Sequence, residues 1–178
     1  MKANRNWYVL YVQGGKETFL RDMINKRGDV VAFVPMMERL YKIRGEYKEA
    51  IKPMFPGYLF IKTDQEQAYI ETLFQEYRLK LRGFRKLLKY DEEGTSALQK
   101  EEVTFLDAIL DEEYVLRMSG GRIVNDVLMI ENGPLVGQEA NIRKIDRHKC
   151  IAYLYVKVLD KEVIAGMIIK EKTNDEKN

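Results

Sequence analysis

Met54-Phe55-Pro56-Gly57-Tyr58-Leu59-Phe60-Ile61 is the stretch of sequence that decides the fold. A proline followed by a glycine predicts a turn or a bulge at 56–57. Residues 58–61 are all apolar or aromatic, which predicts a short strand that is apolar on both faces. Residues 7–12, Trp-Tyr-Val-Leu-Tyr-Val, have the same character. We therefore expect two strands in one sheet, and a face that the helices leave uncovered would be an aromatic docking surface.

The composition bounds the class of protein. The 178 residues have room for one medium domain or two small ones, and 46% apolar content is enough for a packed core. No apolar run reaches the length of a membrane span, and the N-terminus lacks the apolar segment of a signal peptide. The single cysteine, Cys150, excludes an internal disulfide framework and fits a reducing compartment. We expect a cytoplasmic protein that does not associate with membranes.

The first part of the chain alternates strands and helices. We expect strands at 7–12, 30–34, 58–62 and 78–82, an exposed hairpin over 38–52 with Arg44-Gly45 near its tip, and helices at 17–26, 66–77 and 97–106, the last with Ser96 as N-cap. The strand at 78–82 is predicted from the alternation of basic and apolar residues. This order indicates an α+β fold with a small antiparallel sheet.

The composition changes after a polar connection at 111–121. Short β-branched runs follow at 127–130, 139–145, 150–159 and 163–169, and turns separate them. Several short strands without a helical period predict a small β-barrel. Residues 173–178 are polar, and we expect them to be frayed.

The sequence gives little support for catalysis. The only histidine, His148, lies beside Cys150 in a predicted tight turn, and two-residue spacing is weak evidence for a nucleophilic pair. No second cysteine or histidine is available to complete a zinc site, and no dinucleotide-binding glycine pattern occurs. We therefore expect no enzyme activity, no cofactor and no metal ion.

Two clusters of basic residues are candidate nucleic-acid sites. The first is a strip that could follow phosphates, or equally a solvated strand edge protected by its charges: Arg78, Lys80, Arg82, Arg85, Lys86 and Lys89. The second gathers at one hairpin of the expected barrel: Arg143, Lys144, Arg147, His148 and Lys149. Tyr153 and Tyr155 follow it, so a basic loop would adjoin an aromatic platform of the kind that binds nucleic acid. The alternative is an ordinary charged turn beside half-buried tyrosines.

At this point the motifs of the chain resemble a known family, the NusG transcription elongation factors. The motifs that carry the resemblance are Trp7-Tyr8-Val9-Leu10, Phe55-Pro56-Gly57-Tyr58, and Asn132-Gly133-Pro134-Leu135-Val136-Gly137 followed by Ile145-Asp146. The resemblance covers nearly the whole chain. It implies an N-terminal NGN domain over 1–110, in which helices flank an antiparallel sheet, a linker over 111–121, an SH3-like KOW barrel over 122–172, and a tail.

The resemblance also implies partners and a use for the aromatic face. In relatives the NGN domain docks onto the clamp helices of the β′ subunit of RNA polymerase and bridges the DNA cleft. The matching positions here are Tyr11, Phe55, Tyr58 and Phe60. The basic strip from Arg78 would then lie toward upstream or non-template DNA. We expect a monomer that suppresses pausing and termination.

One departure places the chain within the family. Ala140 stands where the KOW motif usually has glycine, and the runs 116–121 and 144–149 are most similar to the LoaP group of antitermination factors. That group implies a KOW domain that recognises a hairpin in nascent leader RNA. Two alternatives stay open: a general NusG factor whose KOW domain meets Rho or the ribosome, and a ribosomal RNA-binding protein with a KOW motif.

Overall fold

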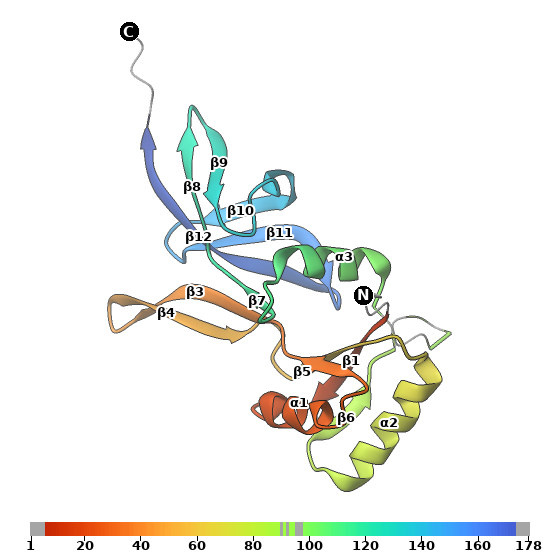
Figure 1. Cartoon of the computed structure of the whole chain (residues 1–178). Coiled ribbons are helices and arrows are strands. Elements are labelled where there is room, and N and C mark those ends of the chain that lie inside the picture. Colours follow the sequence, from red (N-terminus) through yellow and green to blue (C-terminus); the bar gives the residue numbers. More distant parts are fainter. Residues whose placement is uncertain (1–5, 90, 92, 95–97, 174–178) are drawn as a thin grey trace. The chain divides into compact units, whose positions relative to one another are not determined.

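The computed structural model describes residues 6–89, 91, 93–94 and 98–173, with residues 171–173 described by their backbone alone. The chain divides into two compact units (Figure 1). Unit 1 comprises residues 1–35 and 55–104, and unit 2 comprises residues 36–54 and 105–178. Within the described residues, no helix combines the length and the apolar character needed to cross a membrane.

Unit 1 is built on a four-stranded antiparallel sheet with the strand order β2-β5-β1-β6. The strands are β1 (Asn6–Val12), β2 (Val31–Phe33), β5 (Tyr58–Thr63) and β6 (Phe84–Leu87). The two runs singled out in the sequence pair directly, with Tyr11 opposite Tyr58 and Val9 opposite Phe60. The prediction that they are neighbouring strands is therefore confirmed.

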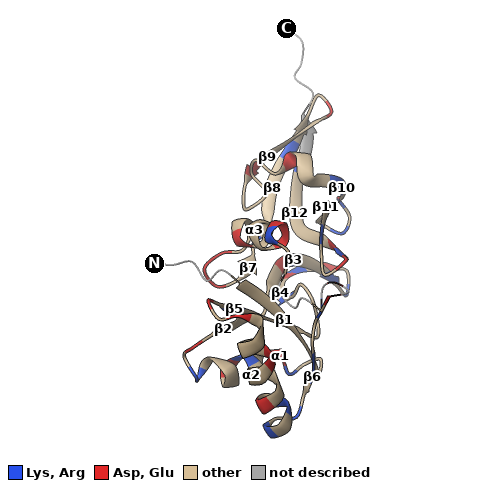
Figure 2. Cartoon of the chain, turned by 90° about the vertical axis from the view of Figure 1, so that its right-hand side faces the viewer, with Lys and Arg blue, Asp and Glu red and all other residues tan. Residues whose placement is uncertain are grey.

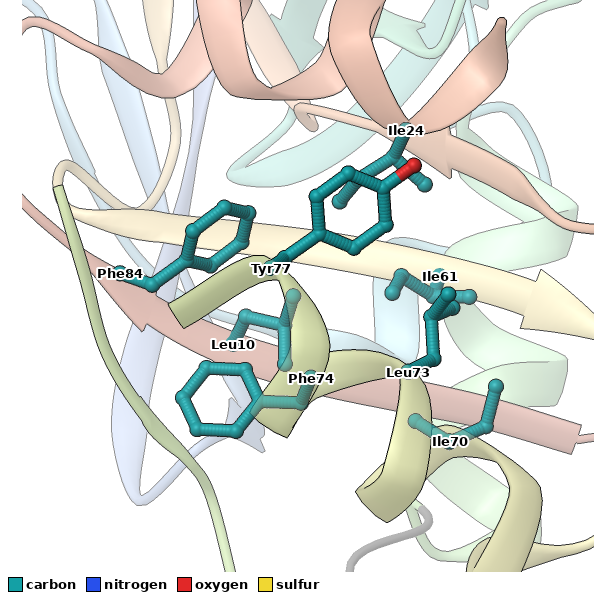
Figure 3. A pocket seen from close by; sticks show the side chains of 8 residues that line it. All are labelled: Leu10, Ile24, Ile61, Ile70, Leu73, Phe74, Tyr77 and Phe84. Carbon is teal, nitrogen blue, oxygen red and sulfur yellow. The ribbon is translucent and has the colours of Figure 1, made fainter. Parts of the chain in front are cut away.

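The helices α1 (Glu17–Asn25) and α2 (Gln67–Lys80) cover one face of this sheet. Figure 3 shows how side chains from both helices meet side chains of the sheet between them: Leu10, Ile24, Ile61, Ile70, Leu73, Phe74, Tyr77 and Phe84. In α2 the apolar positions recur three and four residues apart, which gives the helix one continuous buried stripe. This packing fixes the helices to the sheet.

The predicted strand at 78–82 is wrong. Helix α2 continues to Lys80, the Leu81 N–H donates to the Tyr77 carbonyl at 2.7 Å, and strand β6 starts only at Phe84. Extending a helix that is already packed adds a hydrogen bond per residue without a new nucleation cost, so a five-residue alternation could not compete. Leu79, one of the apolar residues of that alternation, is 88% exposed.

The Pro56-Gly57 turn has the predicted form. The Tyr58 N–H donates to the Phe55 carbonyl at 3.1 Å, and Gly57 has a φ of +85°. Proline followed by a residue of positive φ is the pattern of a type II turn, and this position favours glycine. The turn directs the chain into β5.

Unit 2 contains a five-stranded sheet with the order β10-β11-β12-β8-β9. Its strands are β8 (Ser119–Val124), β9 (Val127–Asn132), β10 (Ile142–Asp146), β11 (Ile151–Val158) and β12 (Lys161–Thr173), with a short helix η1 (Glu139–Asn141) before β10. Four of these strands overlap the predicted runs. The structure supports a β-rich C-terminal part, and closure into an SH3-like barrel stays a prediction.

Unit 2 also contains the predicted hairpin, formed by β3 (Met36–Ile43) and β4 (Glu46–Pro53). Arg44 and Gly45 both have positive φ at its tip, as a two-residue hairpin turn requires. The hairpin forms a three-stranded sheet with β7 (Val115–Leu116), which runs parallel to β3. It therefore packs with the C-terminal strands rather than with the sheet of unit 1.

The segment 111–121 differs from the polar connection that we expected. It contains β7 and the start of β8, and the Leu116 side chain is fully buried. The Arg117 guanidinium pairs with Asp111, at 2.6 Å from Nε to Oδ2, and with Glu38 of β3 at 3.5 Å. Contacts distant in sequence thus order a segment whose composition indicated a linker. The domain boundaries at 110 and 122 stay predictions.

Helix α3 (Lys100–Ile109) begins later than the predicted 97. The Glu102 carboxylate accepts the Gln99 N–H at 3.0 Å just before the helix. The predicted N-cap Ser96 lies outside the described residues, as does the tail beyond Thr173.

Candidate docking and nucleic-acid surfaces

The first candidate surface lies on the face of the unit 1 sheet opposite α1 and α2. The aromatic side chains on this face form two ring groups. The first runs Trp7–Phe33–Phe60–Phe55, with ring centroids 5.2, 5.6 and 5.7 Å apart in that order. The second is the pair of Tyr11 and Tyr58, whose centroids are 5.6 Å apart. Spacings of this size are typical of favourable aromatic contacts.

Exposure separates the two groups. Tyr11 is 40% exposed and Tyr58 is half-buried, whereas Phe55 and Phe60 are 3% and 0% exposed. The expectation that all four rings lie on an uncovered face is therefore wrong for Phe55 and Phe60. Phe60 sits in the middle of β5 between two other rings, whereas Tyr58 begins the strand. The residue types already indicated this difference in exposure. A phenol hydroxyl favours a position with access to water, and phenylalanine has no such group.

The tyrosine pair is positioned by the Pro56-Gly57 turn. The Val12 N–H donates to the Gly57 carbonyl at 2.8 Å, and a Cβ added to Gly57 would lie 3.4 Å from the Tyr11 ring. The basic residue Lys86 of β6 stands opposite Tyr11 in the sheet. The accessible surface is thus two tyrosine rings with a lysine in the next strand, smaller than the sequence indicated.

A buried carboxylate that the sequence analysis missed supports this turn. Glu17, the first residue of α1, is buried, and its Oε1 accepts the Gly57 N–H at 2.8 Å. Buried charges are rare unless they are hydrogen-bonded. The contact joins residues forty positions apart, so no local pattern could have revealed it.

The second candidate surface is the basic turn between β10 and β11. Arg147, His148 and Lys149 are all exposed there. Asp146 shapes the turn: its Oδ1 accepts the Lys149 N–H at 2.9 Å, and this backbone hydrogen bond is the main reason that the pKa of Asp146 lies below its usual value. The Tyr47 hydroxyl of the β3–β4 hairpin donates to the His148 carbonyl at 2.7 Å. The turn is therefore fixed from within and from the hairpin.

The remaining two basic residues of this cluster lie against a tyrosine. The strand pairing shifts by one residue between Ile142 and Lys144, which marks a bulge. The Arg143 Cζ lies 5.6 Å and the Lys144 Nζ 6.0 Å from the centroid of the Tyr153 ring, within the range of cation–π contacts. Arg143 also pairs with Glu162, at 2.8 Å from Nε to Oε1, so its charge is partly neutralised.

The structure thus brings the predicted cluster together in two parts. The first part lies on the strands, where Lys144 is next to Tyr153 and where Tyr155 is 65% exposed. The second part is the three basic residues of the turn, at the end of the same strands. In Figure 2, β10 and its connection to β11 carry blue segments. A basic loop next to accessible rings is an arrangement that can hold phosphates and stack bases. The Cys150 thiol donates to the Arg147 carbonyl, with Sγ 3.5 Å from the oxygen.

The third candidate, the strip in unit 1, is spread over several elements. Arg78 and Lys80 end α2, Arg82 follows in the connection, Arg85 and Lys86 lie in β6, and Lys89 comes after it. All six side chains are exposed. Arg78 and Lys89 line one cleft of about 280 Å³ together with Phe74, Leu87, Glu71 and Gln75. Figure 2 shows blue and red segments mixed at the end of α2, so the strip is not a continuous basic strand.

Among the described residues, no three histidine, cysteine, aspartate or glutamate side chains are grouped so that they could hold a metal ion. The buried Tyr8 hydroxyl donates to the Gln65 carbonyl at 3.3 Å, and burial raises the pKa of Tyr8. Burial, followed by the negative charges of Glu66 and Glu71, accounts for this raised pKa, so it needs no catalytic explanation.

Comparison with known families places the N-terminal part of the chain in a family. The NusG family model, described as "Transcription termination factor nusG", matches residues 5–106, which is more than half of the chain. No protein among the curated sequences matches the chain. The matched range contains the tyrosine pair, the Pro56-Gly57 turn and the basic strip.

Proposed function

The chain belongs to the NusG family of transcription factors, and we propose that it is a non-enzymatic adaptor for processive antitermination. In this proposal unit 1 binds RNA polymerase on the clamp helices of the β′ subunit, and the β10–β11 region of unit 2 binds a hairpin of nascent leader RNA. The family in general binds RNA polymerase and acts in transcription elongation and termination. The antitermination role within the LoaP group and the RNA contact are the parts that the proposal adds.

The observation that supports polymerase docking is the accessible tyrosine pair. Tyr11 and Tyr58 expose apolar rings next to Lys86 on a sheet whose other face is covered by α1 and α2. Tyrosine is enriched in binding hot spots because it offers a large apolar area with a polar tip. The pair is preorganised by its ring contact and by the turn beneath it, so little conformational entropy is lost on docking.

The test of polymerase docking is a pull-down with purified core RNA polymerase. We expect Tyr58→Ala combined with Tyr11→Ala to abolish capture, to leave RNA binding nearly unchanged and to keep a cooperative unfolding transition at modestly lower stability. The matched control is Tyr69→Ala, which removes a half-buried tyrosine of α2 whose hydroxyl accepts a hydrogen bond from Arg27. Capture that persists with both docking tyrosines removed would contradict the proposed surface.

The test of RNA binding is a titration against a leader RNA hairpin at several salt concentrations. We expect Arg147→Ala combined with Lys149→Ala to weaken binding and to reduce the slope of log K against log salt, because each phosphate contact contributes about 0.7–0.9 to that slope. A control that removes the same charge elsewhere is Lys26→Ala with Lys100→Ala, both on exposed helix ends of unit 1. An unchanged titration would exclude the turn as the RNA-binding site.

A general elongation factor is the second candidate. The description of the matching family as a termination factor favours it, and the C-terminal unit would then meet Rho or the ribosome. A transcript map after gene deletion separates the two functions, because loss of a specialist changes the transcription of a few long operons and loss of a general factor changes that of most genes.

Transcription is cytoplasmic in bacteria, and we place the action of the protein there. Co-sedimentation with ribosomal subunits would instead point to a ribosomal RNA-binding protein.

A further inference from the structure

The β3–β4 hairpin carries a further basic surface, which lies outside the three candidate surfaces described above. Antiparallel pairing places Arg39 opposite Ala50, Tyr41 opposite Lys48, and Met37 opposite Lys52. Side chains of paired residues, and of every second residue along a strand, lie on the same face. One face of the hairpin therefore gathers Arg39, Lys48 and Lys52 around Tyr41.

The two faces of the hairpin differ in charge. The other face carries Glu38, Leu40, Lys42, Tyr47, Glu49 and Ile51, so it holds two acids and one base. The face around Tyr41 holds three bases, and its only acid, Glu46, pairs with Ile43 beside the tip. The positive charge of the hairpin is therefore concentrated on the face around Tyr41. A face with concentrated positive charge attracts polyanions.

Tyr41 holds two of the cations in place. The Lys52 Nζ lies 4.1 Å and the Arg39 Cζ 4.3 Å from the centroid of its ring. Cations at this distance are attracted by the π face of the ring. Because they occupy positions over the ring, Tyr41 is not available for stacking against a base. The face is therefore suited to phosphates rather than to reading base sequence.

The cations of this face have no acidic partner within the part of the chain that the structure describes. The described ion pairs do not include Arg39, Lys48 or Lys52, although Arg117, Arg122 and Arg143 of the same unit are each paired with a glutamate or an aspartate. The Arg39 Nε is buried without a hydrogen-bond partner. Uncompensated charges in fixed positions are better prepared to bind an anion than paired ones, because no existing ion pair has to be broken.

The hairpin is fastened to the basic turn. The Tyr47 hydroxyl donates to the His148 carbonyl of the turn at 2.7 Å. Two further contacts join the hairpin to the rest of the unit. The Glu38 Oε2 accepts the Met118 N–H at 2.9 Å, and a Cβ on Gly166 of β12 would lie only 2.4 Å from the Glu38 carbonyl oxygen. Both basic surfaces thus belong to one compact unit, and a ligand held by the turn would be at high effective concentration for the hairpin.

We propose that the Tyr41 face of the hairpin is a second RNA-binding site, which holds the phosphate backbone of the same RNA that the β10–β11 turn binds. The inference rests on the RNA-binding role of unit 2 proposed above. RNA is favoured over DNA as the ligand because the hairpin is joined to the turn. The site is independent of base sequence, and it lengthens the stretch of RNA that the protein holds.

The experiment uses the full chain and two probes of matched sequence, a stem-loop RNA of about 20 base pairs and the corresponding DNA duplex. We expect Lys48→Gln with Lys52→Gln to reduce the salt slope for RNA by about 1.4–1.8, since two phosphate contacts are lost. The control Lys26→Gln with Lys100→Gln removes the same charge from unit 1 and should leave the slope within about 0.4 of the original.

Each outcome has a defined meaning. If the turn variant weakens RNA binding and the hairpin variant does not, the hairpin site is excluded and the proposed function stands. If only the hairpin variant weakens RNA binding, the hairpin site is supported and the turn is excluded as an RNA-binding site. A hairpin variant that changes only the binding of the DNA duplex would overturn RNA as the ligand, and no effect from either variant would exclude both.

A second pair of variants tests the role of Tyr41. Tyr41→Phe keeps the aromatic face, so we expect RNA affinity close to that of the original protein. Tyr41→Leu keeps an apolar side chain but removes the cation–π contacts, and we expect a several-fold loss of affinity, consistent with about 0.5–1 kcal/mol for such a contact. Equal affinities for the two variants would show that the ring does not position the cations.

Discussion

The tyrosine pair of unit 1 and the basic turn of unit 2 are both proposed binding surfaces, but they are built in different ways. Tyr11 and Tyr58 come from two strands 47 residues apart, and they stay accessible while Phe55 and Phe60 nearby are buried. The basic turn is formed by consecutive residues and shaped by the Asp146 side chain within it. Local chemistry therefore predicts the turn, whereas neighbours distant in sequence decide which rings are accessible.

This difference predicts that stability and binding separate within the aromatic group. Phe60→Ala removes a fully buried ring that contacts Phe33 and Phe55, and we expect a loss of about 3–5 kcal/mol in the free energy of unfolding. Tyr58→Ala removes a half-buried ring, so we expect a clearly smaller loss of stability together with weaker polymerase binding. Urea unfolding of both variants measures this, and equal losses would contradict the division into buried and docking rings.

The turn beneath the tyrosines gives the next largest effect. Glu17→Ala leaves the Gly57 N–H without its buried acceptor, and we expect a loss of about 1–3 kcal/mol in stability. Glu17→Gln keeps an acceptor oxygen and should recover part of the loss. Thermal unfolding compares the two variants. If both lose the same stability, the carboxylate charge and not the hydrogen bond to the turn is what matters.

The smallest effect is expected at the basic turn. The pKa of Asp146 lies below its usual value of 3.8, chiefly because its carboxylate accepts the Lys149 N–H. The ionised carboxylate therefore stabilises the fold fully at a pH above its usual pKa. This stabilisation is lost as the pH falls through the lowered pKa. Asp146→Asn should therefore be less stable than the original protein at neutral pH, and the two should converge in acid. A difference that persists in acid would mean that the charge is not responsible.

Part of the candidate sites could be predicted from sequence because the determining contacts are local. The Pro56-Gly57 turn, the hairpin tip at Arg44-Gly45 and the basic turn all follow from residues within four positions of one another. The burial of Phe60 could not be predicted in this way, since it depends on Phe33 in another strand. The same holds for the end of α2, where packing of the helix overrode a short alternating pattern.

The sequence by itself determined the α+β order of elements and membership of the NusG family, because turn residues, apolar runs and short motifs act over a few positions. Only the tertiary structure decided which rings reach solvent, that Glu17 holds the turn, and that the β3–β4 hairpin packs in the C-terminal unit. Those outcomes depend on contacts between different elements of the chain, such as Phe33 with Phe60 and Glu17 with Gly57. The free energy of burial and pairing is fixed only when folding brings these elements together.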